Sequence, residues 1–241
     1  MKMIKNFFQD EQQMKLFFIL SVSTLFCFVL VAFRLKQIGV AFEKIHTLED
    51  LKKYKWNVSF LFLIWNLFLA WIPYWIALAI PKIYDFFKSK IIIAFVLLCW
   101  LLFFPNAPYI LTDLSHIKTR TPIPLWYDVM MILSFAWTGL MLGFLSLFEV
   151  QLFLQKFIGK NMASLMSVIA IFLCGIGIYI GRFQRWNSWD IVANPFALIS
   201  DVINTLIHPL AYMRTLGLAV VISVFLLLGY STIITLLKSE R

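Results

Sequence analysis

Residues 16–33 read LFFILSVSTLFCFVLVAF, an uncharged run that is about as long as a membrane-spanning helix. Arg34 follows directly and no small-residue cleavage site precedes it, which favours an uncleaved span over a signal peptide. The rest of the chain is similarly apolar. Of its 241 residues, 62% are hydrophobic and 14% are charged, and the mean hydropathy is +0.87. Soluble domains carry roughly 25% charged residues, so lipid must be the solvent for much of this chain.

Six segments are long and apolar enough to cross a bilayer, since a helix needs about 20 apolar residues to cross the hydrocarbon core. No linker between them is long enough to separate two domains. We therefore predict an all-α polytopic bundle that forms a single domain over residues 1–241. The predicted transmembrane helices are 15–33, 57–80, 91–111, 126–149, 163–181 and 217–237.

Two connecting segments are predicted to be helices that lie in the membrane interface. Residues 38–55 place apolar side chains at three-to-four spacing with charged residues between them, which is typical of an amphipathic helix. Residues 195–208 begin with Pro195, a common first residue of a helix. At about 14 residues, this second segment is too short to span a bilayer, so a re-entrant helix is the alternative to an interfacial one.

The positively charged residues help to define the orientation and the partners of the protein. The formal net charge of +9 comes from Lys and Arg residues that flank apolar runs, where they meet lipid headgroups. The bilayer is therefore the expected partner, and nucleic acid is not. Six spans place both termini on one side, and three connections (34–56, 112–125 and 182–216) on the other, which we call the loop side. Basic residues are almost equally divided, and the charge density of the short loops on the terminal side favours cytoplasmic termini.

The candidate functional residues gather at the loop-side ends of three predicted spans. Carboxylates beside a histidine suit proton transfer or a hard metal ion, and paired arginines suit the capture of a phosphate or carboxylate. If residues 109–117 are helical, Tyr109, Thr112, Asp113 and His116 lie on one stripe. The candidate catalytic residues are Asp113, His116 and Asp128, and the candidate substrate-binding residues are Asn106, Tyr109, Arg182, Arg185, Trp186, Asn187 and Asp190.

Several of these residues have a structural interpretation of comparable weight. Arg182 and Arg185 could reach the interface and pair with Asp190 or Asp128, holding the mouth of the bundle together. Asn66, in the middle of the second span, is more typical of a hydrogen bond between helices. The pairs Gly139-x-x-x-Gly143 and Gly177-x-x-x-Gly181 favour close helix packing.

The chain lacks the sequence signatures of several common sites. It has no Gly-rich phosphate loop, no Gly-x-Ser-x-Gly elbow and no His-Glu-x-x-His, which argues against an ATPase, a lipase-type hydrolase and a zinc metalloprotease. Its three cysteines lie inside apolar runs without metal-binding spacing, so no metal site is predicted. The cofactors and the oligomeric state are left open.

Four distinctive strings suggest a known family. They are WNLFLAWIP at Trp65–Pro73, FPNAPY at Phe104–Tyr109, WYD at Trp126–Asp128 and GRFQRWNSWD at Gly181–Asp190. Together they resemble the bacterial membrane-protein family catalogued as domain of unknown function 1361, and the resemblance covers about residues 57–205. It implies a multi-pass protein of the bacterial plasma membrane, and it carries no catalytic assignment.

Three functions remain compatible with these features, and the sequence does not decide whether the protein is an enzyme. The first is a protein that binds or processes an anionic, lipid-like substrate at the loop-side face. The second is a small transporter or flippase, for which Asn66, Ser134 and Thr138 would supply a polar path. The third is an accessory membrane protein without chemistry, whose charged residues form ion pairs.

Overall fold

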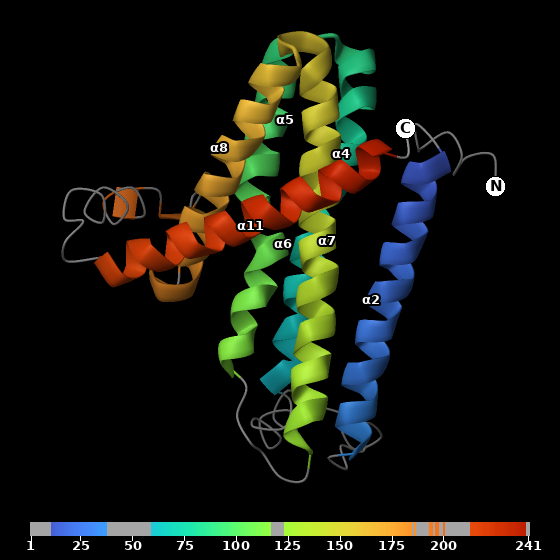
Figure 1. Cartoon of the computed structure of the whole chain (residues 1–241), viewed down its shortest axis with the longest axis vertical. Helices are drawn as coiled ribbons and strands as arrows, with labels where there is room; N and C mark the ends of the chain where they lie inside the picture. Colours follow the sequence, from blue (N-terminus) through green and yellow to red (C-terminus); the bar gives the residue numbers. More distant parts are fainter. Residues whose placement is uncertain are drawn as a thin grey trace. The chain divides into compact units, whose positions relative to one another are not determined.

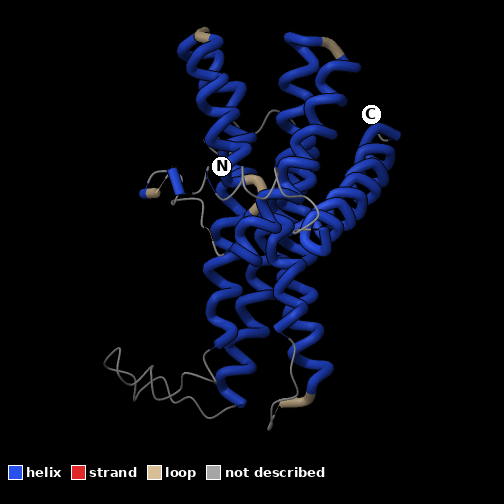
Figure 2. The backbone as a smooth tube through the Cα atoms, turned by 90° about the vertical axis from the view of Figure 1, so that its left-hand side faces the viewer, coloured by secondary structure: helices blue, strands red, loops and turns tan. Residues whose placement is uncertain are grey.

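The computed structural model describes residues 11–37, 59–116, 123–184 and 213–239, together with residues 186, 193, 194, 196, 197 and 200. Every regular element in this part of the chain is a helix, with no strand (Figure 2). Six of these helices are long and apolar enough to cross a membrane. The predicted all-α, multi-span architecture is confirmed. The two predicted interfacial helices fall wholly or almost wholly outside the described residues and stay predictions.

The predicted spans correspond to five continuous helices and one broken helix (Figure 1). In chain order, the described elements are α2 (Glu11–Gln37), η2 (Ser59–Leu61), α4 (Phe62–Phe87), α5 (Lys90–Phe103), α6 (Asn106–Tyr109), η3 (Ile110–His116), α7 (Leu125–Ile158), α8 (Lys160–Tyr179), η4 (Ile180–Gln184) and α11 (Met213–Ser239).

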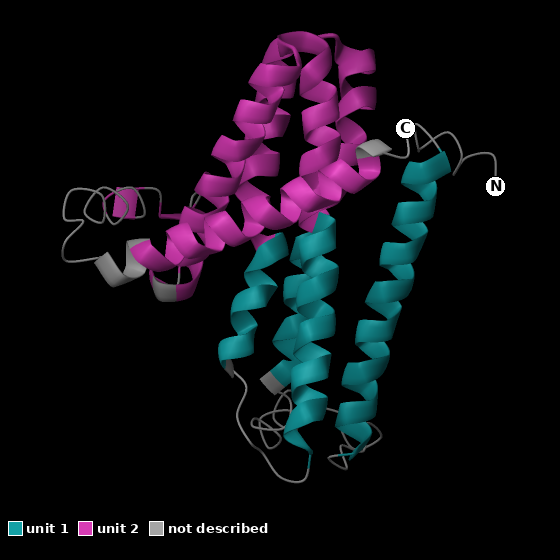
Figure 3. Ribbon diagram, in the orientation of Figure 1, with its two compact units in different colours: residues 1–71, 107–142 teal, residues 72–106, 143–241 magenta. Residues whose placement is uncertain are grey.

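The helices belong to two compact units (Figure 3). Unit 1 comprises residues 1–71 and 107–142, and unit 2 comprises residues 72–106 and 143–241. The division falls inside α4 and inside α7, so each of these helices contributes to both units. It does not test the predicted single domain, which stays a prediction. In unit 1 the fully buried side chains come mainly from α4 and α7: Leu63, Leu67, Met131, Ile132 and Phe135.

The turn between α4 and α5 lies later in the chain than the sequence indicates. The second span was expected to end at residue 80, before Pro81, but α4 continues to Phe87. Proline inside a transmembrane helix is tolerated where neighbouring helices satisfy the freed backbone groups. The helix ends where Lys88 adopts a left-handed φ of 47° and its N–H donates to the carbonyl of Tyr84 at 2.7 Å. The side chain of Ser89 then accepts from the N–H of Ile92 and caps α5.

A single residue joins α7 to α8. Gly159 lies between Ile158, the last residue of α7, and Lys160, the first residue of α8. Its backbone has a φ of 77°, a conformation that residues other than glycine rarely adopt. The segments 81–90 and 150–162, expected from hydropathy to be loops, are therefore largely helical.

The third span is interrupted, although the sequence predicts one helix over 91–111. Residue 105 is a proline, which has no N–H for the helical hydrogen bond and a ring that clashes with the preceding turn. The helix α5 therefore ends at Phe103, and the side chain of Asn106 donates to the Phe103 carbonyl at 3.0 Å. The chain then continues as the short helix α6 and the 3-10 helix η3. In unit 1, Gly139 lets α7 approach this segment closely, because a Cβ there would lie 2.5 Å from the Ala107 oxygen.

The spans differ widely in how much protein covers them. In the most apolar stretch of α7, 78% of the residues are buried, whereas the figure is 17% for α2 and for α11. The helix α7 is thus the most buried of the six spans, and α2 and α11 are the least buried.

Candidate functional site

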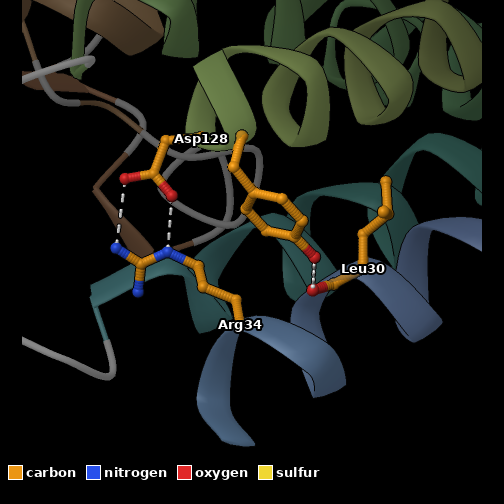
Figure 4. Close-up of polar contacts among 4 residues, drawn as sticks. Leu30, Arg34 and Asp128 are labelled. Atoms are coloured by element: carbon orange, nitrogen blue, oxygen red, sulfur yellow. Dashed lines mark hydrogen bonds and ion pairs between the residues drawn. The ribbon is translucent and has the colours of Figure 1, made fainter. Parts of the chain in front are cut away.

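Asp128 forms a buried ion pair that joins two helices of unit 1 (Figure 4). Asp128 lies in the first turn of α7, and its partner Arg34 lies near the end of α2. The Arg34 Nε donates to Oδ1 of Asp128 at 2.7 Å, and Nη2 donates to Oδ2 at 3.2 Å. The two side chains are only 3% and 2% exposed. Two parallel charge-assisted hydrogen bonds are the strongest arrangement available to an arginine and a carboxylate.

Neighbouring side chains hold the same turn of α2. The hydroxyl of Tyr127 donates to the backbone carbonyl of Leu30 at 2.7 Å (Figure 4). The guanidinium of Arg34 lies over the ring of Phe60, 4.1 Å from its centroid. Tyr127 and Asp128, consecutive residues at the start of α7, therefore both bond to the end of α2. The Phe60 ring adds a cation–π contact to the guanidinium.

Asp113 is the second buried carboxylate of unit 1. It lies in η3 with 1% of its surface exposed, and Oδ2 accepts a hydrogen bond from Nδ2 of Asn66 at 3.0 Å. The amide comes from α4, so the expected hydrogen bond between helices at Asn66 is present. Asp113 is thus oriented by a neutral side chain from another span.

The helix that carries Asp113 and His116 has a different pitch from the one expected. Residues Ile110–His116 form a 3-10 helix, in which residues three apart eclipse one another. The four-residue spacing of the expected α-helical stripe therefore does not apply to this segment. The side chain of His116 lies outside the described part of the chain.

A line of hydrogen bonds continues from the ion pair along α2. Thr138 on α7 lies 2.7 Å from the hydroxyl of Ser23 and 3.6 Å from the sulfur of Cys27. On α4, the indole N–H of Trp71 donates to the hydroxyl of Thr24 at 3.0 Å. We call this contact line the α2 seam, formed on α2 by Ser23, Thr24, Cys27, Leu30 and Arg34.

Arg34 is the residue that sequence reasoning missed. It was counted only as a basic residue flanking the first span. The buried residues of α2 include Gln13, Leu20, Cys27 and Arg34, which recur every seven residues. That repeat, typical of a helix packed along one narrow face, was the available signal.

The remaining predicted site residues are distributed over both units and beyond them. Tyr109 belongs to unit 1, and Asn106 and Arg182 belong to unit 2. Arg182 is half-buried in η4, a π-helical turn at the end of α8. Trp186 is half-buried, and Arg185, Asn187 and Asp190 lie outside the described residues. Asp113 and Asp128 therefore share one unit, and the expected approach of the arginines to them stays a prediction.

Unit 2 contains a polar cluster that the sequence did not indicate. Gln151 on α7 is 3% exposed, and its amide bonds to both neighbouring helices. It accepts from the hydroxyl of Tyr230 on α11 at 2.5 Å and donates to the hydroxyl of Ser164 on α8 at 2.9 Å. The indole of Trp100 donates to the hydroxyl of Ser146 at 2.6 Å. The bonds of Gln151 thus connect α7 with α8 and α11, and the bond of Trp100 connects α5 with α7. Among the described residues, no group of three His, Cys, Asp or Glu side chains forms a metal-binding cluster.

Comparison with known protein families gives one match. The model of a family described as protein of unknown function, DUF1361, matches residues 65–229, more than half of the chain. The chain belongs to the DUF1361 family. No curated protein and no solved structure matches it. The DUF1361 match includes Asn66, Asp113 and Asp128, but it begins after α2, so Arg34 lies outside the matched region.

Proposed function

We propose that this membrane protein binds and processes an amphiphilic substrate with an anionic headgroup at the loop-side end of unit 1. The observation that carries the proposal is Asp113, a carboxylate 1% exposed in a membrane-spanning segment and oriented by Asn66. An ionisable side chain inside the membrane is costly and usually serves a function. The proposed setting is the bacterial plasma membrane, with both termini in the cytoplasm.

In this proposal the two carboxylates have different tasks. Asp113 transfers a proton to or from the substrate, and Asn66 positions it. Asp128 is engaged through both oxygens by Arg34, so we assign it to holding that guanidinium rather than to the proton transfer. His116, three residues after Asp113, relays the proton.

Aromatic side chains give an amphiphile a route to this site. Trp65 on α4 and Trp126 on α7 are both more than half exposed on unit 1, near the loop-side ends of their helices. Trp side chains are favoured at the headgroup layer because the ring is apolar and the indole N–H is polar. A lipid-like molecule approaching unit 1 would meet these rings first.

The decisive experiment makes the same substitution at Asp113 and at an exposed aspartate, so that both variants lose one carboxylate. Asp113→Asn keeps the size of the side chain but removes the acid–base group, and Asp85→Asn makes the same change at an exposed position on α4. We expect Asp113→Asn to fail to complement a deletion strain and to retain unprocessed anionic lipid on purification, measured by mass spectrometry. Asp85→Asn should behave as wild type, and both should elute as folded protein. Equal behaviour of the two variants would rule out the proposed role of Asp113.

The interrupted third span favours one other function, that of a small transporter or flippase. Helices broken within the membrane frequently line substrate paths, because their free backbone groups face the cargo. The test is a vesicle assay in which reconstituted protein moves a fluorescent phospholipid between leaflets. A transporter would show protein-dependent movement that falls when Pro105→Ala restores the helix. A processing protein would show no such movement, and its lipid retention would depend on Asp113 instead.

A further inference from the structure

The α2 seam is a narrow contact between a helix that faces lipid and the rest of unit 1. On its outer side α2 exposes large apolar residues, including Phe18 at 67% and Leu25 at 61%. Its inner side buries Leu20, Val31 and Leu35, and Phe17 and Phe33 form ring contacts with Trp71 and Tyr127. The polar contacts to α4 and α7 come from hydroxyls, one thiol, one backbone carbonyl and Arg34. Lipid tails can replace apolar contacts, so the polar contacts are the ones that specify where α2 packs.

The strongest of these contacts is the ion pair, and it lies at the end of the seam. A buried guanidinium cannot leave its carboxylate inside a membrane protein unless another anion replaces it. A phosphate offers the same two-point geometry to arginine as a carboxylate does. An anionic headgroup is therefore a chemically matched substitute for Asp128 on Arg34.

The start of α7 can accommodate the released carboxylate. Asp128 lies in the first helical turn, where the partial positive charge of the helix N-terminus stabilises an anion. No charged residue occurs in α7 between Asp128 and Glu149, a stretch of about 20 residues that is the length of a full span. Asp128 therefore belongs at the edge of the hydrocarbon core, next to the headgroup layer and its water.

We infer that Arg34 is the residue that receives the substrate's headgroup phosphate, and that the substrate enters between α2 and α7. The phosphate takes the place of Asp128 on the guanidinium, and the α2 seam opens toward the lipid. This inference rests on the proposed function, because it supplies the entry route and the first anion-binding residue for the same substrate.

The seam contains a natural reporter for this movement. Cys27 faces Thr138 across the seam with 3.6 Å between their side-chain atoms. A Thr138→Cys variant, with Cys99 and Cys174 replaced by alanine, holds one cysteine pair that forms a disulfide only while the seam is closed. The measurement is the initial rate of disulfide formation with a membrane-permeant oxidant, followed by gel mobility.

The full-length protein is reconstituted in three kinds of vesicle: phosphatidylcholine alone, phosphatidylcholine with phosphatidylglycerol, and phosphatidylcholine with a polyprenyl phosphate. We expect an anionic lipid to slow disulfide formation by about five-fold, as the closed population falls. If phosphatidylglycerol slows disulfide formation more, the ligand is a bulk phosphodiester lipid. If polyprenyl phosphate slows it more, the ligand is a lipid-linked phosphate monoester. Native mass spectrometry of the same samples records whether the lipid is bound.

A matched pair of substitutions assigns the effect to the ion pair. Arg34→Gln should make the disulfide rate independent of lipid charge. Lys36→Gln removes the same charge from an exposed position two residues later and should leave the dependence intact. Anionic lipid that binds without slowing the disulfide, or Lys36→Gln acting like Arg34→Gln, overturns the inference but not the proposed function. If no anionic lipid binds the wild-type protein, both fail.

Discussion

The first and last spans are equally exposed, yet they are attached to the protein in different ways. In the most apolar stretch of both α2 and α11, 17% of the residues are buried. The helix α2 is held by an ion pair and hydrogen bonds at the α2 seam. In contrast, α11 packs by close approach, because a Cβ on Gly175 of α8 would lie 2.7 Å from the Ala219 oxygen of α11. A polar contact with α7 is the hydrogen bond that the Tyr230 hydroxyl donates to Gln151.

The difference follows from the solvent. Between two helices in lipid there is little hydrophobic force, so association depends on tight van der Waals packing or on polar contacts. Close packing at glycine is short-ranged and depends on the fit between two particular helix surfaces. A charge pair can be exchanged for another partner of the same charge. We therefore expect α11 to be a permanent part of unit 2 and α2 to be the releasable helix of unit 1.

The largest effect is expected from breaking the ion pair. Arg34→Met leaves Asp128 buried without its cation and should lower the free energy of unfolding by about 3–5 kcal/mol. The double variant Arg34→Met/Asp128→Leu should recover most of the loss, because an apolar pair of similar volume is tolerated. Unfolding by detergent titration measures both. An Arg34→Met protein as stable as Lys36→Met, the exposed control, would contradict the comparison.

A smaller effect is expected at the close contact of α11. Gly175→Val forces the α8 and α11 backbones apart and should cost about 1–3 kcal/mol. The matched control is Gly217→Val, since a Cβ at Gly217 meets no atom within 4 Å. The free energy of unfolding of the two variants is compared in the same detergent titration. Equal stability would show that close packing does not hold α11.

The hydrogen bond of α11 should contribute less than its packing. Tyr230→Phe removes the donor to Gln151 and should cost about 1 kcal/mol, within the range for hydrogen bonds between membrane helices. A double-mutant cycle with Gln151→Leu isolates the pair. A coupling energy larger than the cost of Gly175→Val would show that the hydrogen bond, and not close packing, holds α11 in place.

The smallest effect is expected in the middle of the α2 seam. Thr138→Val removes a hydroxyl that lies 2.7 Å from Ser23 and that also donates to its own helix at the Ser134 carbonyl. Because the hydroxyl is partly satisfied within α7, we expect a loss of about 0.6 kcal/mol. The same unfolding titration is the measurement. A cost near that of Arg34→Met would mean that the hydroxyls, and not the ion pair, close the seam.

The number of spans could be predicted because the bilayer imposes a length on each of them. Their ends could not, because hydropathy reports where the apolar residues stop and not where the helix stops. The helix α4 passes through Pro81, and α7 continues nine residues beyond the predicted end at 149 through Gln151, Gln155 and Lys156. The interruption at Pro105 could not be predicted either, because proline is also tolerated inside continuous membrane-spanning helices, as at Pro73 and Pro81 of α4.

The site was predictable in its residues more than in its pairings. Asp113 and Asp128 stood out as carboxylates beside apolar runs, and both are buried in unit 1. The partner of Asp128 depends on which helix packs beside α7, which no local pattern in the sequence records. Two arginines after the fifth span were the expected partners, whereas the described partner comes from the end of the first span.

The tight connections in unit 2 bear on how this protein enters the membrane. Only Lys88 and Ser89 separate α4 from α5, and only Gly159 separates α7 from α8. Two helices with so little chain between them form a hairpin, and we expect each pair to enter the membrane together. Four of the six spans would then be integrated in two steps. A longer connection at residue 159 would let α7 and α8 insert separately. The lysines at the hairpin turns, Lys88 and Lys160, would set the side of the membrane on which each turn remains.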